Sequence, residues 1–340
     1  MAKAKEIEGL DCGAEAGAGA RLILSARFEE MRGYRAAALD WSDIEGVHDM
    51  RVASRRLRSA VRDFAPYMRR GGKRLDEARE SLKRLADALG EVRDLDVEIA
   101  ELEKLAAEAP DEEAAEGARL ILAEREERRG LARARLTPEI TEEALEDARR
   151  LLARALDPPR RRGKKKNGDD GERGESLAEA GDRIVLRLWD ELRALSASLY
   201  RPLKTKPLHR MRIAAKRLRY AMELFAACRG RTLKKLASEV ADLQKALGDL
   251  HDCDVWVEEF GGFLAEGSED GGAHSAMRRR AALWLLEHFA EARTRHYRDA
   301  LGIWRGWERD RFGARLAEAL KGEGVDEEGA DAQPAVAAGQ

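Results

Sequence analysis

Two short motifs each occur twice in this chain, and this internal repeat constrains the fold more than any other feature. Residues 47–58 read VHDMRVASRRLR and residues 208–219 read LHRMRIAAKRLR, so seven of the twelve positions are identical. Residues 89–97 read LGEVRDLDV and residues 247–255 read LGDLHDCDV, in the same order and at a similar separation. A chain with this pattern is built from two copies of one structural unit.

The composition favours helices and predicts an all-α fold for both copies. Aromatic residues make up only 5% of the 340 residues and there are eight prolines, whereas Ala, Leu, Arg and Glu dominate. Helical periodicity is interrupted at Gly230 and is absent from a charged central segment. We therefore expect two helical halves, at residues 20–156 and 176–320, joined by a disordered charged linker at residues 157–175. Flexible tails are expected at residues 1–19 and 321–340.

The charge and the cysteines exclude several classes of protein. The net charge of −2 excludes a uniformly basic nucleic-acid coat, so an anion site requires local segregation of charge. Cys12, Cys228 and Cys253 are too few for a disulfide framework, which indicates a reducing cytoplasm. The N-terminus has no apolar core of a signal peptide, and no run approaches the ~18 apolar residues of a membrane span. We expect a soluble cytoplasmic protein without a membrane partner.

The first motif predicts a helix with one cationic side and one apolar side. At about 100° per residue, its basic side chains fall within an arc of about 80°, opposite Met50, Leu57 and Phe64. We call the basic stripe of each copy its cationic ladder. The two ladders comprise His48, Arg51, Arg55, Arg58 and Arg62 in the first copy and His209, Arg212, Lys216 and Arg219 in the second. Secondary candidates for the same site are Arg56, Arg217, Lys83 and Lys245.

The energetics of the ladder favour an anion-binding role. Like charges three or four residues apart destabilise a helix by roughly 0.2–0.5 kcal/mol per pair, and neither stripe contains an acidic residue. A solvated face and pairing with acidic side chains of another helix are the alternatives. Arginine engages phosphate oxygens bidentately, and the ladder rises about 15 Å from His48 to Arg58, which suits an extended polyanion. No aromatic side chain or amide interleaves with the stripe, so phosphate without bases is favoured over nucleic acid.

The second motif predicts structural aspartates. Asp96 and Asp254 fall inside the apolar stripe of their helices, where a carboxylate must be paired or must cap a helix. We expect each to pair with an arginine or a backbone N–H and so to fix helix register. Gly90 and Gly248 of the same motif allow a close approach of helices.

The pairs His48–Asp49 and His251–Asp252 suggest a metal-dependent phosphohydrolase of the HD type. The repeat argues against it, because Arg210 stands at the position of Asp49, and Arg93 stands at the position of His251. A metal ligand would not be replaced by a permanent cation. No nucleophile signature, phosphate loop or Cys/His cluster is present, so we predict no catalytic residue, metal or cofactor.

The doubled pattern H-x-x-R-x-x-x-[RK]-R-x-R, from His48 to Arg58 and from His209 to Arg219, precedes LG-x-x-[RH]-D-x-D-V in each copy. Together these motifs resemble the CHAD family, the conserved histidine α-helical domain. The resemblance covers nearly everything outside the tails, residues 20–320. It implies two four-helix bundles related by pseudo-twofold symmetry, which form one module with a basic central groove.

The resemblance also implies a function, namely the non-enzymatic binding of inorganic polyphosphate, at polyphosphate granules and in contact with granule-associated proteins. The implied ligand contacts are His48, Arg51, Arg55, Arg58, His209, Arg212, Lys216 and Arg219. The repeat is inexact at Arg93 and His251, which leaves the part of the second motif in binding open. A phosphohydrolase, and a scaffold for nucleic acid or another acidic polymer, are the alternative functions. Lowered pKa values for His48 and His209 among bare arginines predict tighter binding toward pH ~6.

Overall fold

The computed structural model describes four stretches of the chain, residues 4–68, 72–156, 174–266 and 272–321. Within them, extended pairing is limited to an isolated bridge between Glu15 and Ser176, and the rest of the regular structure is helical. The predicted all-α fold is therefore confirmed. None of these described helices has both the length and the apolar character of a membrane span.

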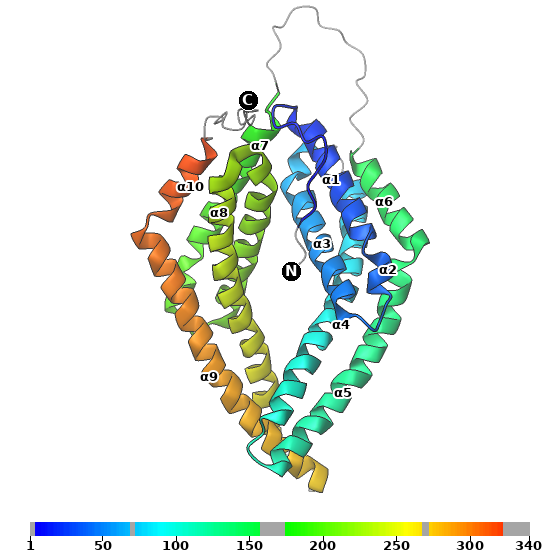
Figure 1. The fold of residues 1–340 in the computed structure, drawn as a ribbon, viewed down its shortest axis with the longest axis vertical. Helices are drawn as coiled ribbons and strands as arrows, with labels where there is room; N and C mark the ends of the chain where they lie inside the picture. The colour runs from blue at the N-terminus through cyan, green and yellow to red at the C-terminus, as the bar shows by residue number, and fades with distance from the viewer. Residues whose placement is uncertain (1–3, 69–71, 157–173, 267–271, 322–340) are drawn as a thin grey trace, which may run out of the picture.

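The chain forms helices in the order shown in Figure 1. The first half contains α1 (Ala16–Arg32), α2 (Arg35–Ala38), α3 (Ile44–Asp63), α4 (Gly72–Ala107), α5 (Glu112–Leu136) and α6 (Glu142–Leu156). The second half contains α7 (Leu177–Ala194), α8 (Thr205–Ala265), α9 (Ala273–Arg309) and α10 (Phe312–Leu320). The short 3-10 turns are η1 (Ala65–Tyr67), η2 (Thr137–Ile140) and η3 (Ser196–Tyr200).

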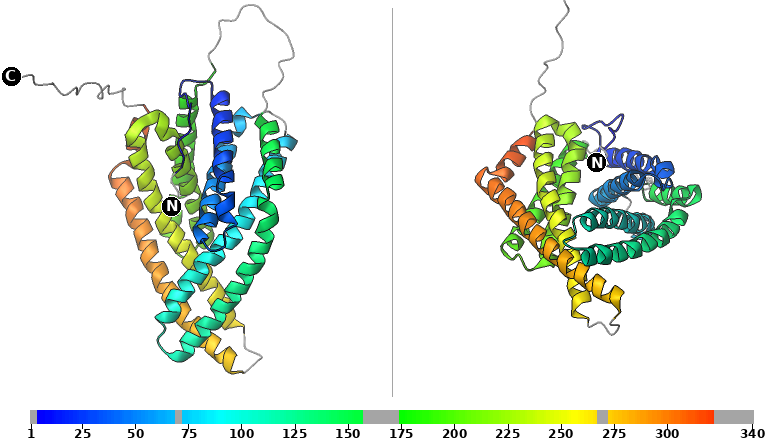
Figure 2. Two further views of the ribbon diagram at one scale, coloured as in Figure 1. Left: turned by 45° about the vertical axis from the view of Figure 1, so that its right-hand side comes forward. Right: turned by 60° about the horizontal axis from the view of Figure 1, so that its bottom comes forward.

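Two long helical hairpins set the shape of the molecule. Helix α5 runs back along α4, α9 runs back along α8, and the far ends of both hairpins meet at the bottom of Figure 1. A core cluster fills this junction with one or more apolar side chains from each of the four helices, among them Leu102, Ile121, Trp256 and Phe289. The main core lies toward the opposite end, and α1, α3, α4, α7 and α8 supply most of its buried side chains. Figure 2 shows these helices from two further directions.

Helix α8 is interrupted at Gly230, as the sequence predicts. Its φ of 82° and ψ of −165° are non-helical, and a positive φ favours glycine because it has no Cβ. The break separates the first motif of the second half from the second motif. Helices α1, α3, α4, α5 and α6 are thus matched in order by α7, the two parts of α8, α9 and α10. The pseudo-twofold relation between the halves stays a prediction.

The apolar sides of the two ladder helices form the centre of the main core. Met50 and Leu57 on α3 and Phe64 directly after it are fully buried, as are Met211, Leu218 and Met222 on α8. Burial of one such side chain contributes roughly 1.5–3 kcal/mol to the free energy of folding. The Phe64 and Phe225 rings meet edge to face at 6.0 Å between centroids, so the two halves share one core where the ladder helices adjoin.

The N-terminal segment and the cysteines differ from expectation. Cys12 forms a disulfide with Cys228, which the reducing cytoplasm expected from the few cysteines does not favour, whereas Cys253 is free and buried. The backbone N–H groups of Ala16 and Leu177 donate to Glu175 and Ala14 at 2.9 and 2.8 Å, so residues 4–19 are packed and are not a free tail. Residues 157–173 of the expected linker, and residues 1–3 and 322–340 of the expected tails, lie outside the described residues.

Candidate anion-binding site

The ladder of α3 begins one turn after a capped helix start. Asp43 caps α3 by accepting a hydrogen bond from the Glu45 backbone N–H at 2.9 Å, which stabilises the first turn and its exposed N–H groups. Because the opposite side of the helix is buried in the core, His48, Arg51 and Arg55 face away from it and are only partly exposed. Tertiary packing therefore determines the direction of the ladder.

The ladders of α3 and α8 face each other. The pKa of Lys216 is lowered to about 7, first by burial and then by the charges of Arg55, Arg212 and Arg51. Burial and the charge of Arg55 likewise lower the pKa of Arg51 to about 10. Four cations from two helices therefore lie within one another's electrostatic field.

The second motif contacts the ladder arginines. The Arg51 Nη2 atom donates to the Asp94 Oδ1 atom at 2.8 Å, and the Arg51 side chain lies over Gly90. Burial lowers the pKa of Arg212, and the Asp252 carboxylate opposes that shift most strongly. Sequence reasoning did not identify Asp94 or Asp252 as parts of the site. The repeat could have identified them, because both occupy the same position of the second motif.

The two ladder histidines have lowered pKa values, as predicted, but burial rather than arginine charge is the main cause. For His48 the charge of Arg93 is the second cause. The pKa of His209 is lowered to about 4 by burial and then by His251, whose ring centroid lies 4.2 Å from that of His209. Both histidines are therefore neutral at pH 7 in the free protein.

The far end of the ladders is paired with acidic groups. The Arg62 Nη2 atom donates to the Asp63 Oδ1 atom at 2.9 Å, while Arg58 is half-buried. Arg219 is only 6% exposed and lies 3.6 Å from Glu223, so its burial argues against the ligand contact that the family resemblance implies. The inward part of the site therefore consists of His48, Arg51, Arg55, His209, Arg212 and Lys216.

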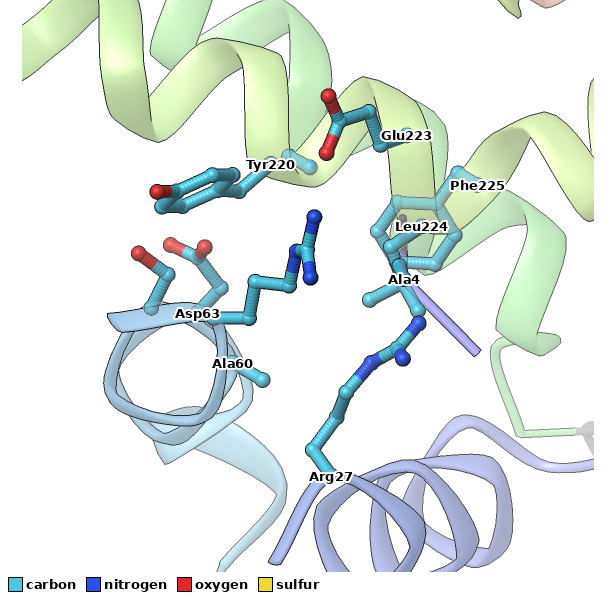
Figure 3. A pocket seen from close by; sticks show the side chains of 11 residues that line it. Ala4, Arg27, Ala60, Asp63, Tyr220, Glu223, Leu224 and Phe225 are labelled. Carbon is cyan, nitrogen blue, oxygen red and sulfur yellow. The ribbon is translucent and has the colours of Figure 1, made fainter. Parts of the chain in front are cut away.

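Arg56 lies away from the ladder, in the core of the protein. Its Nη1 atom is 3.7 Å from the Glu30 Oε1 atom, and Glu30 is itself buried beside Arg27 at 2.5 Å. Arg56 and Arg27 line a cavity of about 20 Å³, into which Asp63 and Tyr220 also point (Figure 3). A cavity of this size holds one water molecule, so this cluster is structural and offers no phosphate site.

The other secondary candidates have acidic neighbours of their own. The exposed Lys83 Nζ atom lies 3.9 Å from Asp87, and the exposed Lys245 Nζ atom donates to Asp249 at 2.7 Å. Burial lowers the pKa of Arg217, followed by the charge of Arg62. Lys83 and Lys245 thus serve as surface lysines with which the ladder can be compared.

Both aspartates of the apolar stripe have arginine neighbours, as expected. Asp96 lies 3.6 Å from Arg129 and 3.7 Å from Arg133, and burial raises its pKa. The Arg293 Nε atom donates to the Asp254 Oδ1 atom at 2.6 Å. The proposed role of these pairs in helix register stays a prediction.

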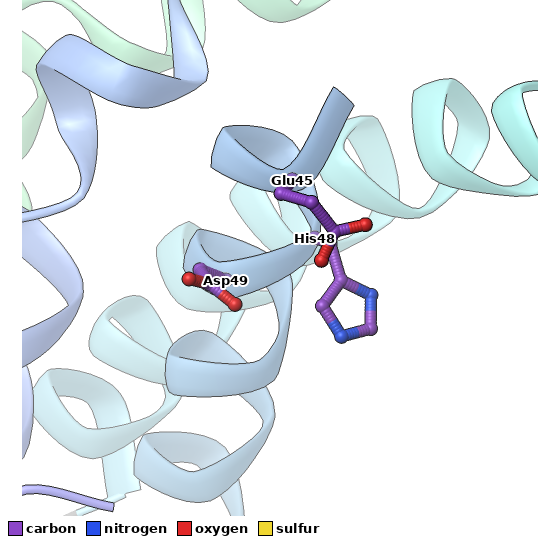
Figure 4. A group of neighbouring side chains, drawn as sticks. All are labelled: Glu45, His48 and Asp49. Atoms are coloured by element: carbon purple, nitrogen blue, oxygen red, sulfur yellow. The ribbon is translucent and has the colours of Figure 1, made fainter. Parts of the chain in front are cut away.

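Three side chains at the start of α3 have the spacing of a metal site. Ligand atoms of Glu45, His48 and Asp49 all lie within 4.8 Å of one another (Figure 4). The Arg93 Nη2 atom, however, lies 3.9 Å from the Glu45 Oε1 atom, and its charge also acts on His48. A permanent cation at this position disfavours a metal ion, and the absence of a metal site stays our prediction.

Comparison with known proteins identifies the family and the fold of the chain. A family model described as the CHAD domain matches residues 22–261. The chain is similar to the crystal structure of the CHAD domain from the plant Ricinus communis, with 23% identity and a TM-score of 0.61, over 88% of this chain and 94% of that chain. It is similar to PptA from Streptomyces chartreusis, with 14% identity and a TM-score of 0.62, over 86% of this chain and 100% of that chain. No curated protein matches it. Because the family model spans more than half of its length, the chain belongs to the CHAD domain family.

Proposed function

We propose that the protein binds inorganic polyphosphate without converting it, through the ladders of α3 and α8. One observation carries the proposal: the charges of Arg51 and Arg55 of one ladder and of Arg212 of the other all act on the partly buried Lys216. Convergence of like charges is unfavourable in the free protein. A multiply charged anion between the helices offsets this repulsion, and the separation of the cations along each helix suits a chain of phosphates.

The kind of side chain supports phosphate as the ligand. Arginine offers a planar fork that donates two hydrogen bonds to phosphate oxygens, and it stays charged at every working pH. Membership of the CHAD family supports the same ligand, because inorganic polyphosphate is what the family resemblance implies. Under this proposal the protein acts in the cytoplasm at polyphosphate granules, with granule-associated proteins as partners.

A binding role fits the ladder better than an enzymatic one. The ladder arginines have no lone pair with which to act as a base or a nucleophile, and no nucleophile signature accompanies the neutral ladder histidines, so the ladders suit holding phosphate better than attacking it. We therefore propose that the protein is not an enzyme. The alternatives, a metal-dependent phosphohydrolase and a scaffold for nucleic acid, predict different outcomes in one titration.

That titration compares long-chain polyphosphate, orthophosphate and duplex DNA at equal phosphate concentration, with Mg²⁺ or Mn²⁺ and with released orthophosphate monitored. We expect polyphosphate to bind far more tightly than orthophosphate, because many simultaneous contacts raise avidity. Affinity should fall steeply between about 50 and 200 mM salt through counterion release. Release of orthophosphate that is lost in Asp252→Asn would establish a hydrolase, and tighter binding of DNA would establish the scaffold.

Binding is also expected to weaken as the pH rises above about 7. The free protein has a Lys216 pKa of about 7, and a bound polyanion raises that pKa, so binding takes up a proton above this pH. Affinity should therefore fall by up to about tenfold per pH unit above pH ~7 and depend little on Lys216 below it. Calorimetry in buffers of different ionisation enthalpy measures the proton uptake directly.

Lys216→Arg is the matched control for this pH effect, because arginine keeps the charge but does not titrate in this range. The variant should bind polyphosphate with a flat profile between pH ~7 and ~8.5. An unchanged slope in the variant would assign the pH dependence to another group, such as the two ladder histidines.

A further inference from the structure

Each half holds its main ladder arginine in a similar cradle made by the second motif. A Cβ atom added at Gly90 would lie 3.8 Å from the Arg51 Nε atom, and one added at Gly248 would lie 3.7 Å from the Arg212 Nε atom. Four residues beyond each glycine stands an aspartate, Asp94 or Asp252. The arginine side chain passes over the glycine in each half. Asp94 then accepts a hydrogen bond from Arg51, and Asp252 acts on Arg212 through its charge.

The two aspartates act on both ladders. The Asp94 carboxylate accepts a hydrogen bond from Arg51 at 2.8 Å. Its negative charge also raises the pKa of Arg212, which burial lowers. Burial raises the pKa of Asp252, and the nearby charge of Arg212 lowers it. Smaller effects come from Asp94 and Asp249, which raise this pKa, and from Arg51, which lowers it. These carboxylates are therefore placed where they offset the repulsion among the ladder cations.

The exposure of the Arg51–Asp94 ion pair suits a replacement of the carboxylate by a phosphate. The Asp94 side chain is 63% exposed, whereas that of Arg51 is 18% exposed. An ion pair with one partner in water is weak, so a phosphate chain with several charges can compete with it. The arginine can therefore change partner without leaving its position over the glycine.

We propose that Asp94 and Asp252 are internal counter-anions that occupy the ladder arginines in the free protein and give them up to phosphate. This inference rests on the proposed function. The two carboxylates lower the affinity for polyphosphate while they keep the arginines pointed into the site. They also reduce the salt dependence, because a displaced carboxylate beside the bound chain retains a cation that would otherwise be released.

The test compares Asp94→Asn/Asp252→Asn with the wild-type protein. Asparagine keeps the shape and can still accept a hydrogen bond, so the arginines should stay in place. We expect long-chain polyphosphate to bind about fivefold to twentyfold more tightly. The plot of log affinity against log salt should become steeper by about 1.4, which is about 0.7 for each carboxylate by analogy with single strands.

Asp147→Asn/Asp190→Asn is the matched control. Both of these aspartates are 64% exposed and each pairs with an arginine three residues further along its own helix, Arg150 or Arg193. The control changes the net charge by the same amount, but outside the ladders. It should alter affinity by less than about twofold and leave the salt slope unchanged.

The outcomes separate the two proposals. Unchanged or weaker binding by a folded Asp94→Asn/Asp252→Asn variant, with tight wild-type binding, overturns the counter-anion inference and keeps the proposed function. A wild-type protein that does not bind polyphosphate overturns both. If the double variant does not fold, Asp94→Asn alone serves, because this exposed carboxylate should account for half of the change in salt slope.

Discussion

Arg55→Gln/Lys216→Gln should bind long-chain polyphosphate about 100-fold more weakly than the wild-type protein, or worse. Among the ladder charges, that of Arg55 has the largest effect on the pKa of Lys216, so the two residues form the centre of the converging cations. A hydrogen bond to a charged group contributes roughly 1.5–3 kcal/mol, so two such losses amount to about 3–6 kcal/mol. At 1.4 kcal/mol per factor of ten, the smaller figure corresponds to about 100-fold. Calorimetric titration at fixed salt and pH measures this loss.

Stability provides a second readout for the same variant. Because the substitutions remove two mutually repelling charges, the variant should resist denaturant at least as well as the wild-type protein when no polyphosphate is present. A site that stabilised the fold through its charges would show the reverse. Weaker binding together with undiminished stability is the signature expected of residues retained for a ligand.

Lys83→Gln/Lys245→Gln is the control, because it removes the same charge from exposed lysines of α4 and α8. We expect its affinity to change by less than about threefold. Equal losses in the two variants would mean that net charge alone attracts the polymer. An unaffected ladder variant would mean that the ladders serve acidic side chains, the alternative that the Arg51–Asp94 pair already illustrates.

The second large effect is expected at the junction of the two hairpins. A Cβ atom added at Gly117 of α5 would lie 2.0 Å from the Met277 backbone oxygen of α9 and 2.8 Å from the Ala281 Cβ atom. Because a backbone atom cannot move aside as a side chain can, Gly117→Ala forces the helices apart. We expect a loss of about 1–3 kcal/mol or more in the free energy of unfolding, measured by denaturant titration.

Gly130→Ala in the same helix is the control, since a Cβ atom there would meet nothing within 4 Å. Replacing an unobstructed helical glycine should stabilise the protein by about 0.5–1 kcal/mol. The two substitutions are chemically identical, so opposite signs isolate the close approach of α5 and α9. Equal effects would contradict the crossing of these helices at Gly117.

Local features of the fold could be predicted from the sequence because they depend on periodicity. The helical spacing of Met50, Leu57 and Phe64 identifies a buried face without knowledge of what covers it. The break at Gly230 follows from the conformational freedom of glycine. The same geometry separates basic from apolar side chains, so the membership of each ladder is visible before the fold is known.

Contacts between distant segments could not be predicted in this way. Cys12 and Cys228 are 216 residues apart, and no pattern near either one indicates the other. The N-terminal segment reads as flexible because of its glycines, yet a Cβ atom at Gly19 would lie 2.8 Å from Leu177, so the small residue serves close packing. The burial of Arg219 and the identity of the charges beside Lys216 likewise depend on how α3 and α8 approach each other.

The two anchors between the halves have a consequence for how the ligand is held. Phe64 and Phe225 join the ladder helices near one end of the molecule, and the α4–α5 and α8–α9 hairpins join at the other. The separation of the two ladders is therefore fixed in the free protein. Under the proposed function, little conformational entropy of the protein would be lost when polyphosphate binds. The main entropic cost of binding would then be that of the polyphosphate chain, which must become extended to fit between two ladders at a fixed separation.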